Sequence, residues 1–302
     1  MVVPAGRTGA VLSSQAEAAP SEGWQPSEVQ REREAYRRRR AVRSRVVAGV
    51  STLLVLGLAV FALGSSPGWE RVQQTYFDWD KAVSSFPAVL EGLWLNIRVM
   101  ALCAVLIVAL SLTIAVMRTI RGPVAFPLRL VGTAYVDVFR GLPLLLVIFL
   151  LGFGGPALSL SGLPTSALFW GCTALVLSYS AYVAEVFRAG IESVHPSQRL
   201  AGRSLGLTYG QTLRHVVLPQ AWRRVIPPLM NDLVSLQKDS GLIAVLGVVD
   251  AIRAAQIETA IDFNYTPYVV AGVLFCCLTI PMARLTDRYA RKKGYHGAGG
   301  HL

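Results

Sequence analysis

The sequence lacks the short motifs that mark nucleotide-binding enzymes and zinc proteases. It contains neither GxxxxGKS nor GxxxxGKT, and no HExxH, so the chain has no phosphate-binding loop of its own and no zinc-protease helix. Its four histidines all lie outside the long apolar runs. We therefore expect no catalytic residue, no metal and no cofactor. If the protein moves a solute uphill, the energy must come from a gradient or from a partner.

Cysteine is scarce, and none of the four cysteines has the spacing of a metal ligand or a redox pair. Cys103, Cys172, Cys276 and Cys277 all lie inside apolar runs, with no CxxC and no neighbouring histidine. Zinc sites and secreted disulfide frameworks both require recognisable spacings. We therefore expect these cysteines to be buried and to act as small hydrophobic side chains.

Acidic residues are also few, since 18 Asp and Glu stand against 29 Lys and Arg and give a net charge of +11. One interpretation is nucleic-acid binding. The other is the excess of Lys and Arg that cytoplasmic segments of membrane proteins carry. Hydrophobic residues make up 53% of the chain, which leaves little room for a soluble nucleic-acid domain. We favour the membrane interpretation and expect no nucleic acid as a partner.

Long apolar runs are what the sequence has in abundance. A helix crosses a bilayer with roughly 20 apolar residues, and six runs approach or exceed that length. We expect no cleavable signal peptide, because residues 1–30 have no apolar core. The runs predict membrane spans over residues 46–64, 89–117, 130–153, 165–186, 225–249 and 268–285.

The fold class predicted from these runs is an all-α membrane protein with six transmembrane helices and both termini in the cytoplasm. With six spans, the loops on one face of the membrane contain only three basic residues, Arg71, Lys81 and Arg253. Because basic segments stay cytoplasmic, the other face is the inner one. That face receives the strongly basic residues 31–45, 118–129, 187–224 and 284–293.

The segments outside the spans are predicted from composition. Residues 1–45 are polar and end in REREAYRRRRAVRSR, so we expect a disordered basic tail. An RNA-binding arm is one interpretation of these arginines. An anchor that orients the first span fits better, since a hydrophobic span follows at once. The remaining predictions are an extracytoplasmic loop at residues 65–87, a membrane core at 88–286 and a basic cytoplasmic tail at 287–302.

The basic loop over residues 188–224 is the strongest local signal. Pro196 suits the first turn of a short helix, where its missing N–H costs nothing, and Gly206 suits its end. A second start is expected at Thr208, and Leu218 with Pro219 is expected to end that stretch. The residues alone leave two interpretations open, namely a docking surface for a partner or a loop lying along anionic lipid headgroups.

The spacing within this loop resembles that of the cytoplasmic loop of permease subunits in binding-protein-dependent ABC importers. The family pattern is E-A-A, three residues, G, nine residues and I-x-L-P. Here residues 200–202 stand at the first three positions, Gly206 at the glycine and residues 216–219 at the last four. Leu200 replaces the Glu of the family and Gly202 its second Ala. The change at Leu200 removes any ion pair that the Glu makes in the family.

Four further blocks are similar to the polar amino-acid permeases of these importers. They are YVDVFRGLPLL, SYSAYVAEVFRAGI, LPQAWRRVIPPLMNDLVSLQKDSGL and GVVDAIRAAQ, and they occur in the family's order. The resemblance covers residues 88–286. It implies that the last five helices form an ABC type-1 importer permease core in a bacterial plasma membrane.

The resemblance implies a division of labour among several partners. A second permease, identical or related, would pair with this chain, and two ATPase subunits beneath the pair would bind the ATP. An extracytoplasmic solute-binding protein would deliver an amino acid substrate, and membrane lipid would surround the helices. The residues that it implies for ATPase docking are Ser197, Gln198, Leu200, Ala201, Gly202, Leu205, Gly206, Leu218 and Pro219.

Polar side chains interrupt the fifth predicted span at Gln237, Lys238, Asp239 and Ser240. A charge at the centre of a span costs roughly 2.5–3.5 kcal/mol on insertion scales, so it normally faces a polar cavity or a partner. One interpretation is that these residues line a translocation path. The other is an interhelical pair that only fixes packing.

Three charged residues, Arg140, Glu185 and Arg188, lie near the ends of predicted spans. Arg140 either contacts a substrate carboxylate on the translocation path or anchors a helix end beside the break at residues 141–143. Glu185 and Arg188 are three apart on a predicted helix, and a local ion pair is the favoured interpretation.

Three functional hypotheses follow. The leading one is a permease subunit of an ATP-driven importer for a polar amino acid, because of the ordered blocks and the loop spacing. A gradient-driven secondary transporter or channel would explain Lys238 and Asp239 but not the loop spacing. A scaffold that recruits cytoplasmic proteins through the arginines of residues 31–45 is the third.

Overall fold

The structure is a computed structural model that describes residues 27–120, 122–159 and 161–292, all of whose regular elements are helices. The chain divides into two compact units at Trp69. The elements are α1 (Glu28–Gly64), α2 (Trp69–Tyr76), α3 (Trp79–Thr119), α4 (Phe126–Gly141), α5 (Leu144–Ala157), α6 (Ala167–Glu192), α7 (Pro196–Ser204), α8 (Tyr209–Thr212), the π-helix η1 (Leu213–Val217), α9 (Leu218–Asp239), the 3-10 helix η2 (Ser240–Leu246), α10 (Ala251–Asp262) and α11 (Thr266–Lys292).

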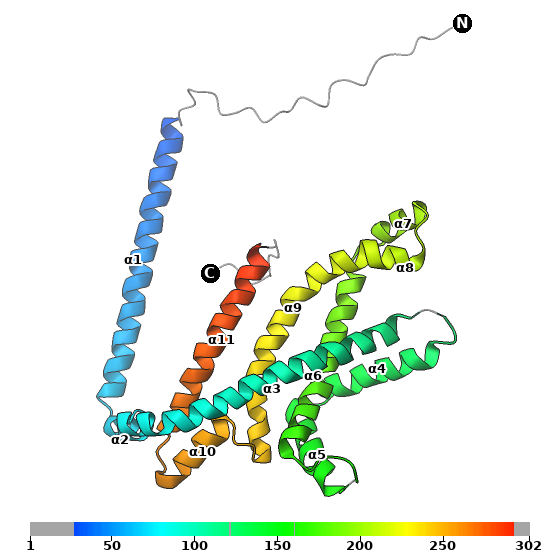
Figure 1. The fold of residues 1–302 in the computed structure, drawn as a ribbon. Coiled ribbons are helices and arrows are strands. Elements are labelled where there is room, and N and C mark those ends of the chain that lie inside the picture. The colour runs from blue at the N-terminus through cyan, green and yellow to red at the C-terminus, as the bar shows by residue number, and fades with distance from the viewer. Residues whose placement is uncertain (1–26, 121, 160, 293–302) are drawn as a thin grey trace. The chain divides into compact units, whose positions relative to one another are not determined.

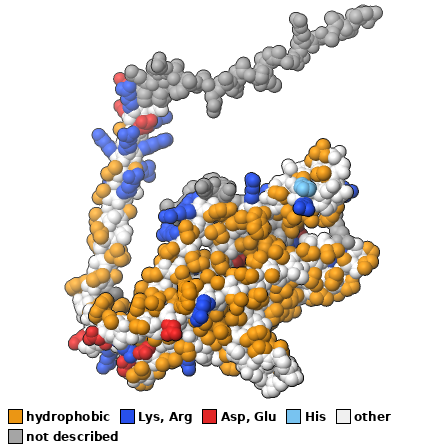
Figure 2. Space-filling model, in the orientation of Figure 1, with side chains coloured by type: hydrophobic (Ala, Val, Ile, Leu, Met, Phe, Trp, Pro, Cys, Tyr) orange, Lys and Arg blue, Asp and Glu red, His pale blue; other side chains and the backbone are white. Residues whose placement is uncertain are grey.

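The first unit contains one long helix, α1, which includes both the arginine-rich segment and the first predicted span. The expectation of disorder is wrong for residues 28–45, which are helical. Arginine has a high helix propensity, and the apolar half of the same helix extends the hydrogen-bond ladder into the basic half. Residues 1–26 lie outside the described residues. Figure 2 shows the arginine side chains gathered on the polar half of α1.

The second unit is built around α6, which packs against α3, α4, α5 and α9. Figure 1 shows α3 crossing both α6 and α9. Side chains from these helices, including Val99, Leu175 and Leu236, form one buried apolar cluster. The surface is also apolar, and Figure 2 shows hydrophobic side chains covering much of the visible face. Such a surface suits lipid contact, because soluble proteins rarely expose large continuous apolar patches.

Two helix pairs are bent where the sequence interrupts a span. α4 and α5 meet at 103°, and Leu142 and Pro143 between them have extended backbone with ψ of 136° and 131°. Proline disfavours helical backbone at the residue before it, so the predicted interruption of the third span is confirmed. The second bend, of 49°, separates the α9–η2 helix from α10.

The number of membrane spans falls between two limits. Four described helices are long and apolar enough to cross a membrane, and there are six candidates if each bent pair is one span. The six-span count and the cytoplasmic placement of both termini stay predictions.

Helices extend beyond the apolar runs at three predicted boundaries, so the predicted loop and tail segments there are partly helical. α3 begins at Trp79 within the expected loop 65–87, since the Asp78 carboxylate accepts the N–H groups of Asp80 and Lys81 at 3.0 and 3.2 Å. α11 continues through residue 292 into the expected tail. Only residues 193–217 lie between α6 and α9, fewer than the predicted loop of 188–224.

Candidate functional site

The short helix α7 has the ends that the sequence predicts. Pro196 is its first residue, and the His195 ring nitrogen accepts the Ser197 N–H at 3.2 Å. At the other end Gly206 has a φ of +80°, and the N–H of Leu207 donates to the Gly202 carbonyl at 3.2 Å. These features form a Schellman cap, which needs a left-handed residue that glycine supplies at no steric cost.

One face of α7 is uncovered, and it carries the residues predicted to dock a partner. Leu200 is 65% exposed and Leu205 is 82% exposed. Gly202 is the exception, since it is buried and a Cβ there would lie 3.0 Å from the Thr212 methyl group. The predicted docking residues with exposed side chains or backbone are Ser197, Gln198, Leu200, Ala201, Leu205, Gly206, Leu218 and Pro219.

The segment after α7 starts as predicted but does not end as predicted. Thr208 caps α8 in a capping box with Gln211, whose side chain accepts the Thr208 N–H at 2.8 Å. The expectation that Leu218 and Pro219 end the stretch is wrong. The π-helix η1 leads directly into α9, and Pro219 lies in the first turn of α9.

Residues 202–206 also match the GxSxG pattern of serine hydrolases. That pattern carries a nucleophile only on a strained turn between a strand and a helix. Here Ser204 lies in the last turn of α7 and donates its hydroxyl to the Leu200 carbonyl at 3.1 Å. The match therefore gives no reason to assign a nucleophile.

The loop is fastened to the end of α6 by arginines and a small apolar cluster. Arg224 donates to the Ser193 carbonyl, and Arg199 donates to the Ile191 carbonyl at 2.6 Å. Val194 and Val217 are both 1% exposed and pack together. These contacts hold the loop against the end of α6 and the start of α9.

The predicted ion pair of Glu185 and Arg188 is confirmed at 2.5 Å. Two partners of this pair were not predicted. Arg118, from the end of α3, contacts Glu185 at 2.9 Å, and Glu192 contacts Arg188 at 2.5 Å. The Arg118 contact joins positions far apart in the chain, so no helical periodicity could have indicated it.

Lys238 and Asp239 lie at the end of α9, where the α-helix changes to the 3-10 helix η2. Asp239 accepts a hydrogen bond from the Tyr179 hydroxyl of α6 at 2.6 Å. Lys238 is exposed, and no ion pair links it to an acid in the part of the chain that the structure describes. The two charges therefore face different surroundings, and only Asp239 has the interhelical contact that the packing interpretation requires.

Gln237 and Ser240 have no exposed surface and belong to a buried polar cluster. Gln237 accepts from Thr279 at 2.6 Å, and Ser240 accepts from the Asn96 amide at 3.3 Å. Asn96 also donates to the Asp250 carboxylate at 3.0 Å. The cluster joins α3, α9, η2, α10 and α11. The role of Gln237 and Ser240 in a translocation path stays a prediction, and in this structure they hold helices together.

Arg140 lies in the last turn of α4, beside the bend to α5. It is exposed, and its guanidinium lies 5.8 Å from the centroid of the Tyr182 ring. This placement fits the helix-end interpretation, and contact with a solute stays a prediction.

The cysteine expectation is right for one residue and wrong for two. Cys103 is buried, whereas Cys276 and Cys277 are exposed on α11. An apolar run does not specify which of its faces is covered, and this face of α11 is exposed among the described residues of the second unit.

Comparison with known proteins places the chain in a family. Residues 120–295 match the family of binding-protein-dependent transport system inner membrane components. The arginine transport system permease protein of Bacillus subtilis is 31% identical over 218 residues, 71% of this chain and 96% of that protein. The glutamate/aspartate import permease protein of Escherichia coli is 30% identical over 72% of this chain and 98% of that protein.

Solved structures agree with this match. A crystal structure of an amino acid ABC transporter with histidines is 31% identical, with a TM-score of 0.66 over 71% of this chain and 98% of that chain. An inward-facing methionine ABC transporter, at 18% identity and a TM-score of 0.56, shares the fold. With more than half of its length matched, this chain belongs to the family of inner membrane components of binding-protein-dependent transport systems.

Proposed function

We propose that this chain is the membrane subunit of an ATP-driven importer that carries polar amino acids into a bacterial cell. The observation that carries the proposal is the exposed face of α7 at the spacing of the family's ATPase-docking loop. The chain binds no ATP itself in this proposal. Two ATPase subunits hydrolyse it, a second permease completes the path, and an extracytoplasmic binding protein delivers the solute.

The substrate class rests on the named activities of the relatives, which include permeases for arginine, glutamine and glutamate. A polar amino acid carries an ammonium and a carboxylate, so its path needs charged or polar contacts within the membrane. The predicted path residues Arg140 and Lys238 are both exposed and supply positive charge.

A negative contact for the ammonium is available on α9. A groove of about 250 Å³ is lined by Tyr179, Asp232 and Leu236 among others. One carboxylate oxygen of Asp232 is buried there, with no hydrogen-bond donor among the described residues. A buried carboxylate without a partner is costly, and an ammonium passing through the groove would satisfy it.

The test is uptake of radiolabelled amino acids into proteoliposomes that contain this chain, its cognate ATPase and its binding protein. We expect uptake that requires ATP inside and persists when ion gradients are dissipated. Uptake by vesicles with this chain alone, driven by a gradient, would contradict the proposal.

Asp232→Asn tests the path within the same vesicles. We expect it to lower uptake about tenfold, the loss expected when one charged hydrogen bond is removed, while ATPase association stays normal. The control is Asp287→Asn near the end of α11. Equal uptake by the two variants would remove Asp232 from the path.

A further inference from the structure

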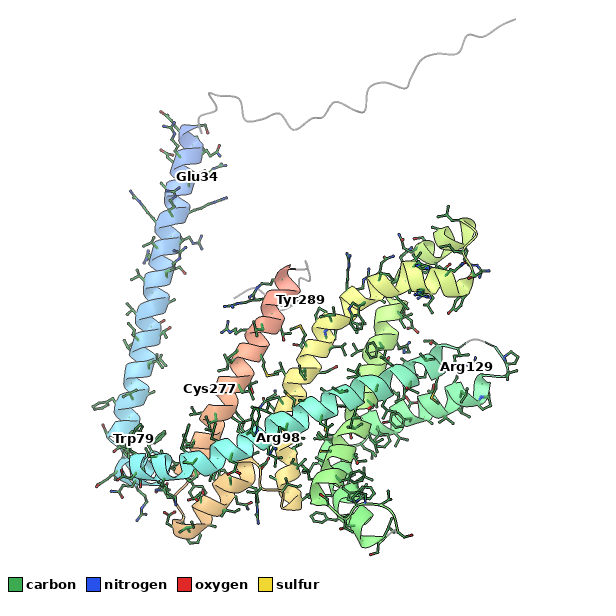
Figure 3. The ribbon with its side chains drawn as sticks, in the orientation of Figure 1. Glu34, Trp79, Arg98, Arg129, Cys277 and Tyr289 are labelled. Atoms are coloured by element: carbon green, nitrogen blue, oxygen red, sulfur yellow. The ribbon has the colours of Figure 1, made fainter. Side chains whose placement is uncertain are left out.

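A cavity of about 370 Å³ lies between the docking helix α7 and the ends of α3, α4 and α6. Figure 3 labels Arg129 at the end of the molecule where α3 and α4 meet. The volume falls at the lower end of the range for ligand pockets, about 300–1,000 Å³. Six of its lining residues are charged, namely Arg118, Arg129, Arg188, Arg199, Arg203 and Glu192.

The carboxylates near the cavity neutralise only part of its positive charge. Arg118 and Arg188 share Glu185, and Arg188 also contacts Glu192. Among the described residues, Arg129 donates only to the backbone carbonyls of residues 120 and 122, at 2.9 and 3.0 Å. Carbonyls satisfy hydrogen bonds without neutralising charge. Arg129, Arg199 and Arg203 therefore have no carboxylate partner within the described residues.

Two of these arginines also keep unused donors. The Arg199 Nε is buried and has no acceptor among the described residues, although another nitrogen of the same guanidinium reaches the Ile191 carbonyl. Arg203 shows no hydrogen bond or ion pair in the described part of the chain, and it lies one turn further along α7. A buried guanidinium donor without an acceptor is destabilising, and an anion in the cavity would supply an acceptor for the Arg199 Nε.

We propose that the cavity binds a phosphate group, which links α7 to the ends of α3, α4 and α6. A phosphate offers several oxygens in the geometry that guanidinium groups bind by paired hydrogen bonds. The bound anion would also relieve repulsion among arginines contributed by four helices. A headgroup phosphate of an anionic lipid and a free cytoplasmic phosphate share this chemistry.

Because α7 is also the proposed docking helix, a bound phosphate would stiffen the connection between docking and the membrane helices. The binding itself needs no ATPase. The phosphate site is a property beyond the transport function, and a binding measurement on this chain alone tests it.

The experiment is calorimetric titration of the full chain with inorganic phosphate at constant ionic strength. The chain is held in nanodiscs of phosphatidylcholine, with or without phosphatidylglycerol. Arg199→Gln and Arg203→Gln each remove a lining charge. The matched control, Arg214→Gln, removes an exposed arginine of the same loop outside the cavity.

We expect saturable binding in phosphatidylcholine that weakens about tenfold in either cavity variant, since each removes a charge-assisted hydrogen bond. The control should bind as the unmodified chain does. If phosphatidylglycerol abolishes the titration, the natural ligand is a lipid headgroup; if it has no effect, the ligand is a soluble phosphate. No saturable binding in phosphatidylcholine, cavity variants that bind normally, or equal weakening in the control would overturn the proposal.

Discussion

At its first residues α3 is tied to α10 and α11 by side chains, whereas at its last residues it borders a loop whose apolar side chains are uncovered. The helix has 41 residues, so these two ends lie about 60 Å apart at 1.5 Å per residue. At the first end Lys81 contacts Glu258 at 3.4 Å and Asp262 at 3.1 Å. At the other end Leu200 and Leu205 on α7 cover nothing.

The two ends differ in how far the described residues cover their side chains. The first end also holds Thr266, whose hydroxyl accepts the Asp78 N–H at 3.1 Å, and a stacked pair of Tyr76 and Tyr265 with ring centroids 5.4 Å apart. These side chains find their partners on neighbouring helices of the chain. Leucine on a short polar helix gains stability only when another surface covers it. The uncovered leucines at the loop end support the proposal that a second protein binds there.

Gly206→Pro should have the largest effect on uptake, because it distorts the docking loop itself. Proline fixes φ near −65°, whereas Gly206 has a φ of +80° and its N–H donates to the Arg203 carbonyl at 3.0 Å. We expect ATP-driven uptake to fall at least about tenfold, which corresponds to roughly 1.4 kcal/mol of lost coupling, while membrane insertion is normal. Uptake in proteoliposomes measures this.

Gly162→Pro is the matched control, since Gly162 also has a positive φ, of +92°, but lies between α5 and α6. An equal loss of uptake in both variants would mean that proline harms the chain generally and would leave the loop end without a special role.

Asp250→Ala tests a second claim, that buried polar contacts hold α3 to α10. The Asp250 side chain caps α10 through the Arg253 N–H at 2.9 Å and accepts from the buried Asn96 amide. Loss of a cap costs about 1 kcal/mol and an orphaned buried group about 1–3 kcal/mol. We expect a stability loss of about 2–4 kcal/mol, seen as a lower melting temperature in detergent.

Asp250→Asn separates the two contributions, because asparagine keeps a capping oxygen. It should lose less stability than the alanine variant. If neither variant melts earlier, the buried cluster is not what holds α3 to α10.

Leu205→Asp should weaken ATPase binding without affecting folding, since the side chain is 82% exposed. Burying a leucine stabilises a complex by about 1.5–3 kcal/mol, so we expect the dissociation constant to rise at least about tenfold. Binding of the cognate ATPase to the chain in nanodiscs measures it. Leu158→Asp, also exposed but beyond the end of α5, should bind normally.

Lys81→Met should have the smallest effect, because ion pairs near a surface contribute less than about 1 kcal/mol. The Lys81 side chain is 12% exposed and its partners Glu258 and Asp262 are 26% and 45% exposed. We expect the melting temperature to fall slightly, and less so in high salt, which screens such pairs. A large loss would show that this pair, and not the buried cluster, holds the first end together.

Sequence reasoning predicted the local features of the molecule better than the distant ones. Pro196, Gly206 and Thr208 each set a helix end through contacts within a few residues, so their positions follow from residue type. The pair of Glu185 and Arg188 is one turn of helix apart and was found for the same reason.

The contacts that sequence reasoning missed join residues far apart in the chain. Asn96 and Asp250 are 154 positions apart, and Arg118 and Glu185 are 67 apart. Their pairing depends on how helices pack, for which a single sequence gives no periodicity. The prediction at Leu218 and Pro219 failed for a different reason. A proline is expected to begin or end a helix, but the wide turn of η1 lets this helix continue through Pro219.

The most direct test of the docking claim is photocrosslinking from position 205. The chain carries benzoylphenylalanine in place of Leu205 or, as the comparison, in place of Leu158, and is reconstituted with its cognate ATPase. We predict a covalent adduct with the ATPase from position 205 and none from position 158. An adduct from position 158 alone, or equal adducts from both, would contradict the assignment of α7 as the docking helix.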